Sequence, residues 1–501
     1  MPKQLEELKN RLREIYDLIQ AGALLSWDEA TYMPPGGAPA RGRQTALLAR
    51  IAHEKSVDPA LGKLLDELQP YQESQPYDSD DASLIRLARR EYERDIKIPP
   101  KFMAELYQHS SKIYNTWVTA RPENNFKALE PLLEHTLDLS RQMADFFPGY
   151  EHIADPLIDL ADYGMKATTL RSLFAQLRRE MVPIVQAITS QPPADDSCLK
   201  RNYPQADQLA FGLEVIKQLG YDFNRGRQDL TLHPFMTKFS LGDIRITTRI
   251  KENDLSDGLF STIHESGHAM YEQGIRMELE GTPLANGTSA GIHESQSRTW
   301  ENLVGRSRGF WEYFYPKLQA KFPQQLKGVS LDTFYRAVNK VQRSLIRTDA
   351  DEVTYNLHVM IRFDIELALL EGNLLVRDLP EYWHQRYKAD LGVRAPDDRD
   401  GVLQDVHWFG GLIGGEFQGY TLGNIMGAQF YTQALKENPA IPQQISQGQF
   451  DTLHNWLIDK VYQHGSKFTA NELIERVTGG PLSIEPYIHY LKEKYGELYQ
   501  L

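Results

Sequence analysis

Cysteine is almost absent from this 501-residue sequence, which contains only Cys198. A single thiol cannot form an internal disulfide, and it cannot supply the cluster of thiolates that holds a structural metal. Apolar runs are also short, and none approaches the roughly 20 residues that a membrane span needs. The N-terminal stretch is charged and helical in pattern, unlike a signal peptide. We therefore expect no membrane partner, and we expect a reducing cytoplasm as the compartment.

Positive charge is in short supply as well. Lysines and arginines number 55 against 68 aspartates and glutamates, which gives a formal net charge of −13 at pH 7. A surface with this balance repels phosphate backbones, so nucleic acid is not an expected partner. At this length the chain can bury a sizeable core. We expect one domain over residues 1–501, because no stretch is long or biased enough to be a domain linker.

Strand signals are few, and three- and four-residue apolar spacing dominates the chain. This spacing predicts helices over residues 5–21, 41–53, 82–97, 101–119, 129–147, 169–189, 331–341, 349–370, 447–461 and 486–495. Loops are predicted over residues 71–81, 191–204 and 438–449. The best strand signal is a hairpin of residues 235–241 and 244–250 around a turn at Gly242 and Asp243. The sequence thus predicts a mainly α protein, a single large helical domain of two lobes around a cleft, with one small hairpin or sheet.

The sequence His264-Glu265-Ser266-Gly267-His268 lies within a helical pattern directly after that hairpin. Residues four apart on an α-helix lie on one face, so the two histidines can bind one zinc ion. Glu265 follows the first histidine and can reach a water on the metal, which makes it the predicted general base. Gly267 costs about 1 kcal/mol relative to alanine inside a helix. We expect that the metal and its substrate need a close approach at this glycine.

A catalytic zinc needs a third protein ligand and one open position. The segment around Glu294 offers a carboxylate on a predicted helix that begins near Ser289, and this helix can return over the first one. His293 is the rival ligand, with Glu294 then in a supporting role. Adjacent helical residues point about 100° apart, so only one of the two can face the ion. We favour Glu294.

Two later segments also carry polar residues that a helical core would not need. Residues 346–351 read Ile-Arg-Thr-Asp-Ala-Asp, and residues 401–408 end in Asp-Val-His-Trp before a glycine-rich turn. An arginine flanked by acids is usually a surface ion pair, and a His-Trp pair is usually core packing. Neither segment indicates a function by itself.

Taken together, these segments resemble the motif set of the carboxypeptidase Taq, or thermostable carboxypeptidase, family of metallocarboxypeptidases. The resemblance extends over nearly the whole chain and rests on residues 27–34, 233–235, 243–247, 264–268, 293–296, 346–351 and 401–408. It implies a helical fold with a deep groove, a homodimer and a zinc site that cobalt can also fill. The implied activity is removal of single residues from the free C-termini of peptides, with broad specificity and reluctance at proline. The implied ligands are His264, His268 and Glu294, with Glu265 as base.

A carboxypeptidase must hold the free carboxylate of its substrate, and a planar guanidinium does so with two parallel hydrogen bonds. We predict Arg347 for this contact, with Arg245 and Arg298 in reserve. The oxyanion that develops during hydrolysis needs a hydrogen-bond donor beside the metal. His407 and Tyr420 are the candidates for this donor.

Two alternatives from other functional classes remain open. An endopeptidase or an aminopeptidase would keep the zinc ligands but lack a cationic pocket for a carboxylate. A non-catalytic protein stabilised by zinc would have four protein ligands and no base, and the presence of Glu265 argues against it.

Overall fold

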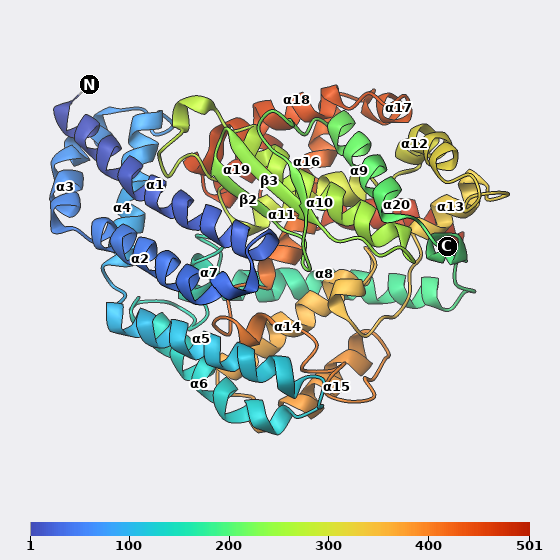
Figure 1. Ribbon diagram of the computed structural model, residues 1–501, viewed down its shortest axis with the longest axis horizontal. Coiled ribbons are helices and arrows are strands. Elements are labelled where there is room, and N and C mark those ends of the chain that lie inside the picture. Colours follow the sequence, from blue (N-terminus) through green and yellow to red (C-terminus); the bar gives the residue numbers. More distant parts are fainter. Residues whose placement is uncertain (1) are drawn as a thin grey trace. The chain divides into compact units, whose positions relative to one another are not determined.

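The computed structural model describes residues 2–501. It is mainly α, as predicted, with one small three-stranded sheet (Figure 1). The chain folds into two compact units, and each unit draws on three separate stretches of sequence. The first unit comprises Met1–Ile96, Asp196–Val338 and Phe430–Pro481, and the second comprises Lys97–Asp195, Asn339–Gln429 and Leu482–Leu501. The cleft predicted between two lobes stays a prediction.

Most helices lie where the apolar spacing predicts them, and several more were not predicted. The first unit contains α1 (Lys3–Thr31), α2 (Ala38–Ser56), α3 (Pro59–Ser74), α4 (Asp80–Asp95), α9 (Gln205–Leu219), α10 (Leu255–Gln273), α11 (Ala290–Arg298), α12 (Arg308–Lys321), α13 (Leu331–Val338), α17 (Ile441–Ser446), α18 (Asp451–Lys460) and α19 (Ala470–Thr478). The second contains α5 (Pro100–Ala120), α6 (Phe126–Asp145), α7 (Asp155–Asp159), α8 (Ala167–Thr189), α14 (Tyr355–Leu370), α15 (Leu379–Asp390) and α20 (Glu485–Tyr499). Helix α16 (Gln418–Glu437) begins in the sequence of the second unit and ends in that of the first.

The structure differs from one predicted helix and from one predicted loop, and the first difference has a local cause. The helix predicted from residue 349 begins only at Tyr355, because the Asp351 carboxylate accepts the backbone N–H groups of Val353 and Thr354, each at 3.0 Å. Carboxylates that bind nearby backbone N–H groups in this way compete with helix formation and favour a helix start. The loop predicted over residues 438–449 contains the short helix α17.

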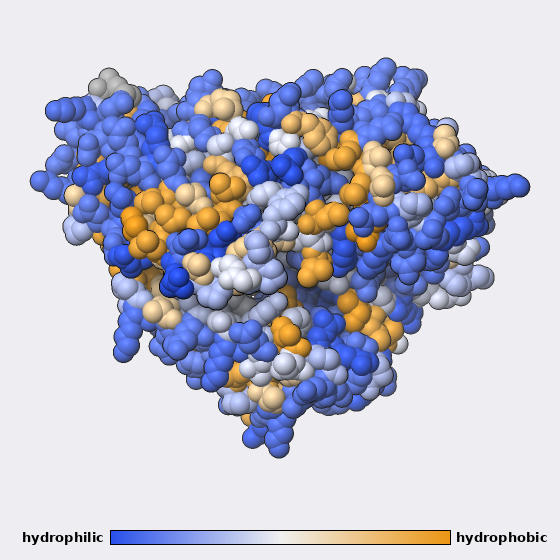
Figure 2. Space-filling model, in the orientation of Figure 1, coloured by the Kyte–Doolittle hydropathy of each residue, from blue (hydrophilic) through white to orange (hydrophobic). Residues whose placement is uncertain are grey.

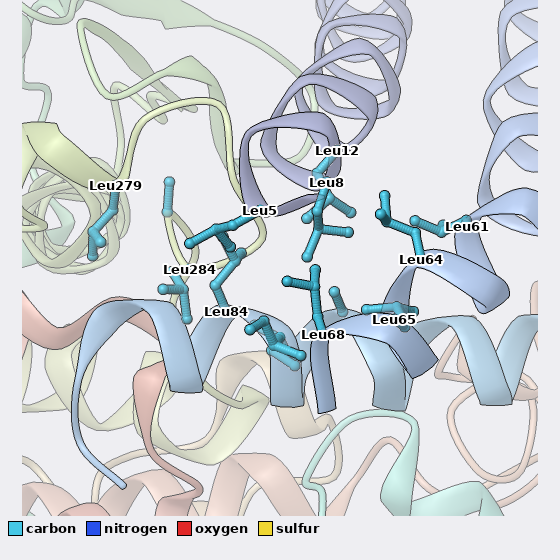
Figure 3. Packing of buried hydrophobic residues seen from close by; sticks show 14 of the residues in the cluster. Leu5, Leu8, Leu12, Leu61, Leu64, Leu65, Leu68, Leu84, Leu279 and Leu284 are labelled. Carbon is cyan, nitrogen blue, oxygen red and sulfur yellow. The ribbon is translucent and has the colours of Figure 1, made fainter. Parts of the chain in front are cut away.

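The core of the first unit shows why the N-terminal sequence is helical. Leu5, Leu8 and Leu12 recur at helical spacing and are buried on one face of α1. They pack against leucines of α3 and α4 and against the chain around Leu279 and Leu284 (Figure 3). Full burial of one leucine side chain contributes about 2 kcal/mol. This cluster therefore fixes α1 against the segment that connects α10 to α11.

The sheet lies beside the helix that carries the predicted metal ligands. Its strands are β1 (Gln228–Leu230), β2 (Met236–Ser240) and β3 (Asp243–Thr248), in the order β1-β3-β2. The antiparallel pair β2 and β3 is the predicted hairpin, whereas β1 pairs with β3 in parallel and was not predicted. Thr248 Oγ1 donates to the carbonyl of Gly258 and accepts from Thr262 Oγ1, at 3.3 and 3.0 Å. These buried bonds hold β3 against α10.

The chain's single thiol, Cys198, is buried in the first unit. Among residues 2–501, none of the helices combines the length and the apolar composition that a bilayer crossing requires.

Candidate active site

Helix α10 presents His264 and His268 on one face, as their spacing predicts. Asp254 caps the helix, since its carboxylate accepts the backbone N–H of Ser256 at 3.1 Å. The opposite faces are apolar and buried, with Ile263 and Tyr271 completely inaccessible. This packing fixes which face of α10 carries the two imidazoles, and their ring centroids are 4.9 Å apart.

Gly267 is required by a neighbouring helix, which corrects the expectation that the metal and substrate need the space. A Cβ on Gly267 would lie 2.7 Å from the Cα of Ser297 and 2.8 Å from the carbonyl oxygen of Gln296. These are backbone atoms of α11, so a side chain here would push α11 away. The glycine lets the two helices approach closely enough for a carboxylate of α11 to reach the histidines.

That carboxylate is Glu294. Its Oε2 lies 3.5 Å from His268 Nε2 and 3.7 Å from His264 Nε2. One ligand atom from each of these residues lies within 4.8 Å of the others, and among residues 2–501 this is the group that could hold a metal ion. Two imidazole nitrogens and one carboxylate oxygen are a donor set that suits a catalytic zinc, with a position left for substrate or water. The donor chemistry of the site therefore fits the predicted metal.

The atoms of these side chains that face away from the group are held by charged partners. His264 Nδ1 lies 2.9 Å from Glu301 Oε2, and the guanidinium Nε of Arg298 donates to Glu294 Oε1 at 2.6 Å. Arg298 also donates to Glu301 Oε2 at 3.1 Å, which joins the two supports. Such partners orient metal ligands and fix the imidazole tautomer. Glu301 was not predicted, although it lies three residues beyond Arg298, a spacing that places two helical residues side by side.

Burial and charge set the protonation of the group. Burial lowers the pKa of His268 to about 4, which favours the neutral, metal-binding imidazole. Burial alone would raise the pKa of Glu294, but Arg298 and His264 hold it well below its usual range. The pKa of Glu301 is likewise lowered to about 2 against the effect of burial, chiefly by Arg298. Burial raises the pKa of Glu265 to about 7.

His293, the rival ligand, contacts the predicted ligand His268 on the side of the His268 ring that faces away from Glu294. Its Nδ1 lies 2.7 Å from His268 Nδ1, the nitrogen that faces away from Glu294. Its Nε2 lies 2.9 Å from Glu272 Oε1. This placement favours Glu294 as the ligand and His293 as its support, as predicted.

The two roles predict different losses of metal. Glu294→Ala removes a negatively charged ligand and should abolish stoichiometric zinc binding, whereas His293→Ala should retain most of the zinc after gel filtration. Metal analysis of both purified variants measures this difference, with wild-type protein as the reference. The reverse order would show that His293 is the ligand.

A second cluster, in the second unit, brings together three of the remaining predicted residues. Arg347 donates to Asp405 through Nε and Nη2, at 2.5 and 3.3 Å, and through Nη1 to the hydroxyl of Tyr355 at 3.0 Å. His407 Nδ1 lies 2.5 Å from Asp405 Oδ1, and its Nε2 lies 2.9 Å from the hydroxyl of Tyr420. Asp405 thus connects the predicted carboxylate anchor to both oxyanion candidates. It lies within the segment that the sequence singled out, but its role depends on contacts that spacing does not show.

The two reserve arginines already have carboxylate partners in the first unit. Arg245 binds Asp243 through Nε and Nη2, at 2.8 and 2.7 Å, and its guanidinium lies 4.5 Å from the ring centroid of Trp27. Arg298 holds Glu294 and Glu301, as described above. Arg347 has the same kind of contact with Asp405, so ion pairing does not rank the three arginines, and Arg347 stays the prediction.

Next to His407, the indole of Trp408 is held by a buried acid. Trp408 Nε1 donates to Glu366 Oε1 at 2.9 Å, and Glu366 is 1% exposed. Burial, with a contribution from Glu416, raises the pKa of Glu366 to about 8. In the unfolded chain the pKa of Glu366 is near 4.5, so below that pH the side chain is protonated in both the folded and the unfolded protein. As the pH rises from there through the folded-state pKa of about 8, ionisation favours the unfolded chain, and the stability contributed by the protonated side chain is lost.

We therefore expect Glu366→Gln to unfold at a higher temperature than wild type, by an amount that grows between pH 5 and pH 8. The gain at pH 8 should correspond to a few kcal/mol, since each pKa unit is worth about 1.4 kcal/mol. Thermal unfolding across this pH range measures it. Glu180→Gln, which alters an exposed ion pair with Lys492, is the control and should show no such increase. A pH-independent difference would mean that Glu366 is ionised in the folded protein.

Comparison with known proteins identifies the family. The family model described as carboxypeptidase Taq (M32) metallopeptidase matches residues 7–495. Thermostable carboxypeptidase 1 of Thermus thermophilus is 42% identical over 497 residues, covering 97% of each chain. Carboxypeptidase 1 of Bacillus subtilis is 37% identical over 497 residues, covering 99% of each chain.

Solved structures agree with this match over the full length. The crystal structure of an M32 carboxypeptidase from Deinococcus radiodurans R1 is 48% identical, covers 100% of both chains and superposes with a TM-score of 0.97. Metallocarboxypeptidase 1 of Trypanosoma cruzi is 30% identical, with a TM-score of 0.93 and coverage of 98% of this chain and 99% of that one. The resemblance inferred from the motifs is confirmed: the chain belongs to the carboxypeptidase Taq (M32) family and is a metallocarboxypeptidase.

Proposed function

We propose that this enzyme is a zinc-dependent carboxypeptidase that removes single residues from the free C-termini of peptides, with broad specificity and reluctance at proline. The observation that carries the proposal is the convergence of His264, His268 and Glu294 beside the buried carboxylate of Glu265. Each of the three ligands is oriented by a further polar side chain. The breadth of specificity and the effect of proline rest on the family resemblance.

His264 Nε2, His268 Nε2 and Glu294 Oε2 would hold the zinc ion, and cobalt can take its place. When bound, the metal polarises the scissile carbonyl and lowers the pKa of water. Glu265 accepts the proton of the attacking water and returns it to the leaving amine. Because Glu265 is 8% exposed, bulk water competes little for this proton.

Arg347 recognises the terminal carboxylate of the substrate. A guanidinium has five N–H donors, and the contacts with Asp405 and Tyr355 use three of them. One N–H on each terminal nitrogen is left by this count, which is the pair that a bidentate carboxylate contact uses. Asp405 keeps the guanidinium in place before substrate arrives.

His407 and Tyr420 stabilise the oxyanion as one unit. The Asp405 carboxylate accepts the proton on His407 Nδ1. When His407 Nε2 also carries a proton, it donates to the Tyr420 oxygen, and the Tyr420 O–H is then the donor available to the oxyanion. Hydrogen-bond donors held in advance in this way stabilise developing negative charge without reorganising during the reaction.

Metal removal tests the proposed chemistry. Protein stripped with a chelator should not hydrolyse an N-blocked dipeptide, and zinc added to one equivalent per chain should restore the rate, as should cobalt. The assay follows release of the C-terminal amino acid alongside metal analysis of the same samples. Full activity in metal-free protein would contradict the proposal.

We also propose a homodimer, from the family resemblance. Large apolar side chains are exposed along α1 and α2, among them Ile19, Leu24 and Leu47, and Figure 2 shows an apolar patch over these helices. Monomers seldom expose contiguous apolar patches without a partner. Sedimentation of wild-type protein should give twice the chain mass of 57.4 kDa, and Leu24→Glu with Leu47→Glu should give the monomer mass. A wild-type monomer would refute the dimer, and a dimeric variant would place its interface elsewhere.

The compartment that we propose is the cytoplasm, because a chain with one cysteine cannot form the internal disulfides that are common in oxidising compartments. The net charge of −13 favours peptide substrates over nucleic acid as partners.

A further inference from the structure

The predicted ligand His268 uses its two ring nitrogens for different partners. Its Nε2 faces Glu294 at 3.5 Å, and its Nδ1 lies 2.7 Å from His293 Nδ1. A neutral imidazole that binds a metal through Nε2 carries its proton on Nδ1. His268 Nδ1–H is therefore the donor of this bond, and His293 Nδ1 must accept it.

The acceptor role at Nδ1 places the proton of His293 on Nε2. That nitrogen lies 2.9 Å from Glu272 Oε1, and an ionised carboxylate can only accept. Glu272 is 4% exposed and also accepts the backbone N–H of Gly287 at 2.9 Å. Each hydrogen bond from His268 to Glu272 thus has a single possible direction when the metal is bound.

A lysine from the sheet completes the arrangement. Lys238, on β2, places its ammonium 2.7 Å from Glu272 Oε2 and 2.7 Å from Asn286 Oδ1. The carboxylate therefore stays ionised despite its burial, and the pKa of Glu272 is lowered to about 2, chiefly by Lys238 and His293 against the effect of burial. A buried carboxylate without such a cation would be costly.

The space around His293 is equally restricted. A Cβ on Gly287 would lie 2.6 Å from His293 Cδ2, so the chain passes the ring at a distance that only glycine permits. On another side the ring centroid of Tyr271 is 5.2 Å away. The His293 imidazole therefore cannot turn away from the line between His268 and Glu272 without displacing Gly287 or Tyr271.

We propose that Lys238, Glu272 and His293 form a positioning chain that fixes the tautomer and orientation of His268 and so sets the affinity of the site for zinc. The inference rests on the proposed metal site. Each of the two predicted histidine ligands is then supported by a glutamate that is paired with a cation. Glu301, paired with Arg298, contacts His264 directly. Glu272, paired with Lys238, acts on His268 through the imidazole of His293. None of the three residues touches the substrate or the reacting atoms in this role.

The test measures the zinc dissociation constant of the full chain by competition with a chromophoric chelator. Glu272→Gln removes the charge and keeps the shape, and loss of such a partner weakens metal binding by about 10- to 100-fold. His293→Leu leaves His268 Nδ1 without an acceptor and should weaken binding at least as much. Glu272→Gln added to His293→Leu should cause little further loss, because Glu272 acts through His293.

Glu352→Gln is the matched control. Glu352 is a buried carboxylate in the second unit with a lysine partner, Lys494, also at 2.7 Å. Its loss should lower the melting temperature and leave zinc affinity unchanged, which separates positioning from a general effect on folding. Should Glu272→Gln fold poorly, His293→Leu carries the test, because it leaves the ion pair of Lys238 and Glu272 intact.

The outcomes separate the two claims. Wild-type protein that fails to bind one zinc per chain would refute the proposed metal site itself. Wild-type binding with unchanged affinity in both Glu272→Gln and His293→Leu would refute the positioning chain alone. Independent, additive losses in the double variant would also refute it, since Glu272 would then act without His293.

Discussion

Glu265→Gln is expected to keep its zinc and to lose turnover by about 10³-fold or more. The amide has the shape of the carboxylate but cannot accept the proton of the attacking water. On α10 it lies between the predicted ligands His264 and His268, which the substitution does not alter. The measurement is kcat on an N-blocked dipeptide, with zinc content determined in the same preparation.

The ligand variants provide the contrast for this experiment. His264→Ala and His268→Ala should lose activity because they lose the metal itself. Their zinc content should therefore fall together with their activity, whereas Glu265→Gln should lose activity alone. A Glu265→Gln variant with its zinc and near wild-type kcat would show that another group is the base.

Arg347→Lys is expected to lower kcat/KM on free-acid peptides by at least about tenfold, because truncating one partner of a buried charge pair costs about 2–5 kcal/mol. A lysine supplies a point charge in place of the planar fork that binds a carboxylate with two parallel bonds. Arg347 is 6% exposed, and its guanidinium is already aligned by Asp405 and Tyr355. Zinc content should not change, since none of the predicted ligands is altered.

Peptides that end in an amide are the control for this variant. They should be poor substrates of the wild-type enzyme, and Arg347→Lys should change their turnover little, because they offer no carboxylate to lose. A silent Arg347→Lys would move the anchor to Arg245 or Arg298.

Many helices with one apolar face were predictable from the sequence. Helix α1 shows this clearly, because Leu5, Leu8 and Leu12 recur at helical spacing. Helix α9, in contrast, was missed although it also carries buried apolar residues. Strand β1 has only three residues and pairs in parallel with β3, so its existence depends on a tertiary contact that no local pattern encodes.

The site divides in the same way. His264, Glu265 and His268 follow from the geometry of a single helix, and Glu294 follows from the need for a third ligand on a returning helix. Glu301 had a helical-spacing signal, but Glu272 and Lys238 lie on different elements and meet only in the folded chain. Gly267 was noticed for its cost in a helix, yet its reason, the backbone of α11, could be seen only once the two helices were placed.

The most direct test of the account compares one N-blocked dipeptide as the free acid and as the C-terminal amide, assayed with the same zinc-loaded sample. Recognition of a terminal carboxylate by a buried arginine predicts that the amide is cleaved at least about tenfold more slowly, since it forfeits a charged hydrogen-bonded pair. Equal rates on the two substrates would contradict the account, because no carboxylate would then be recognised.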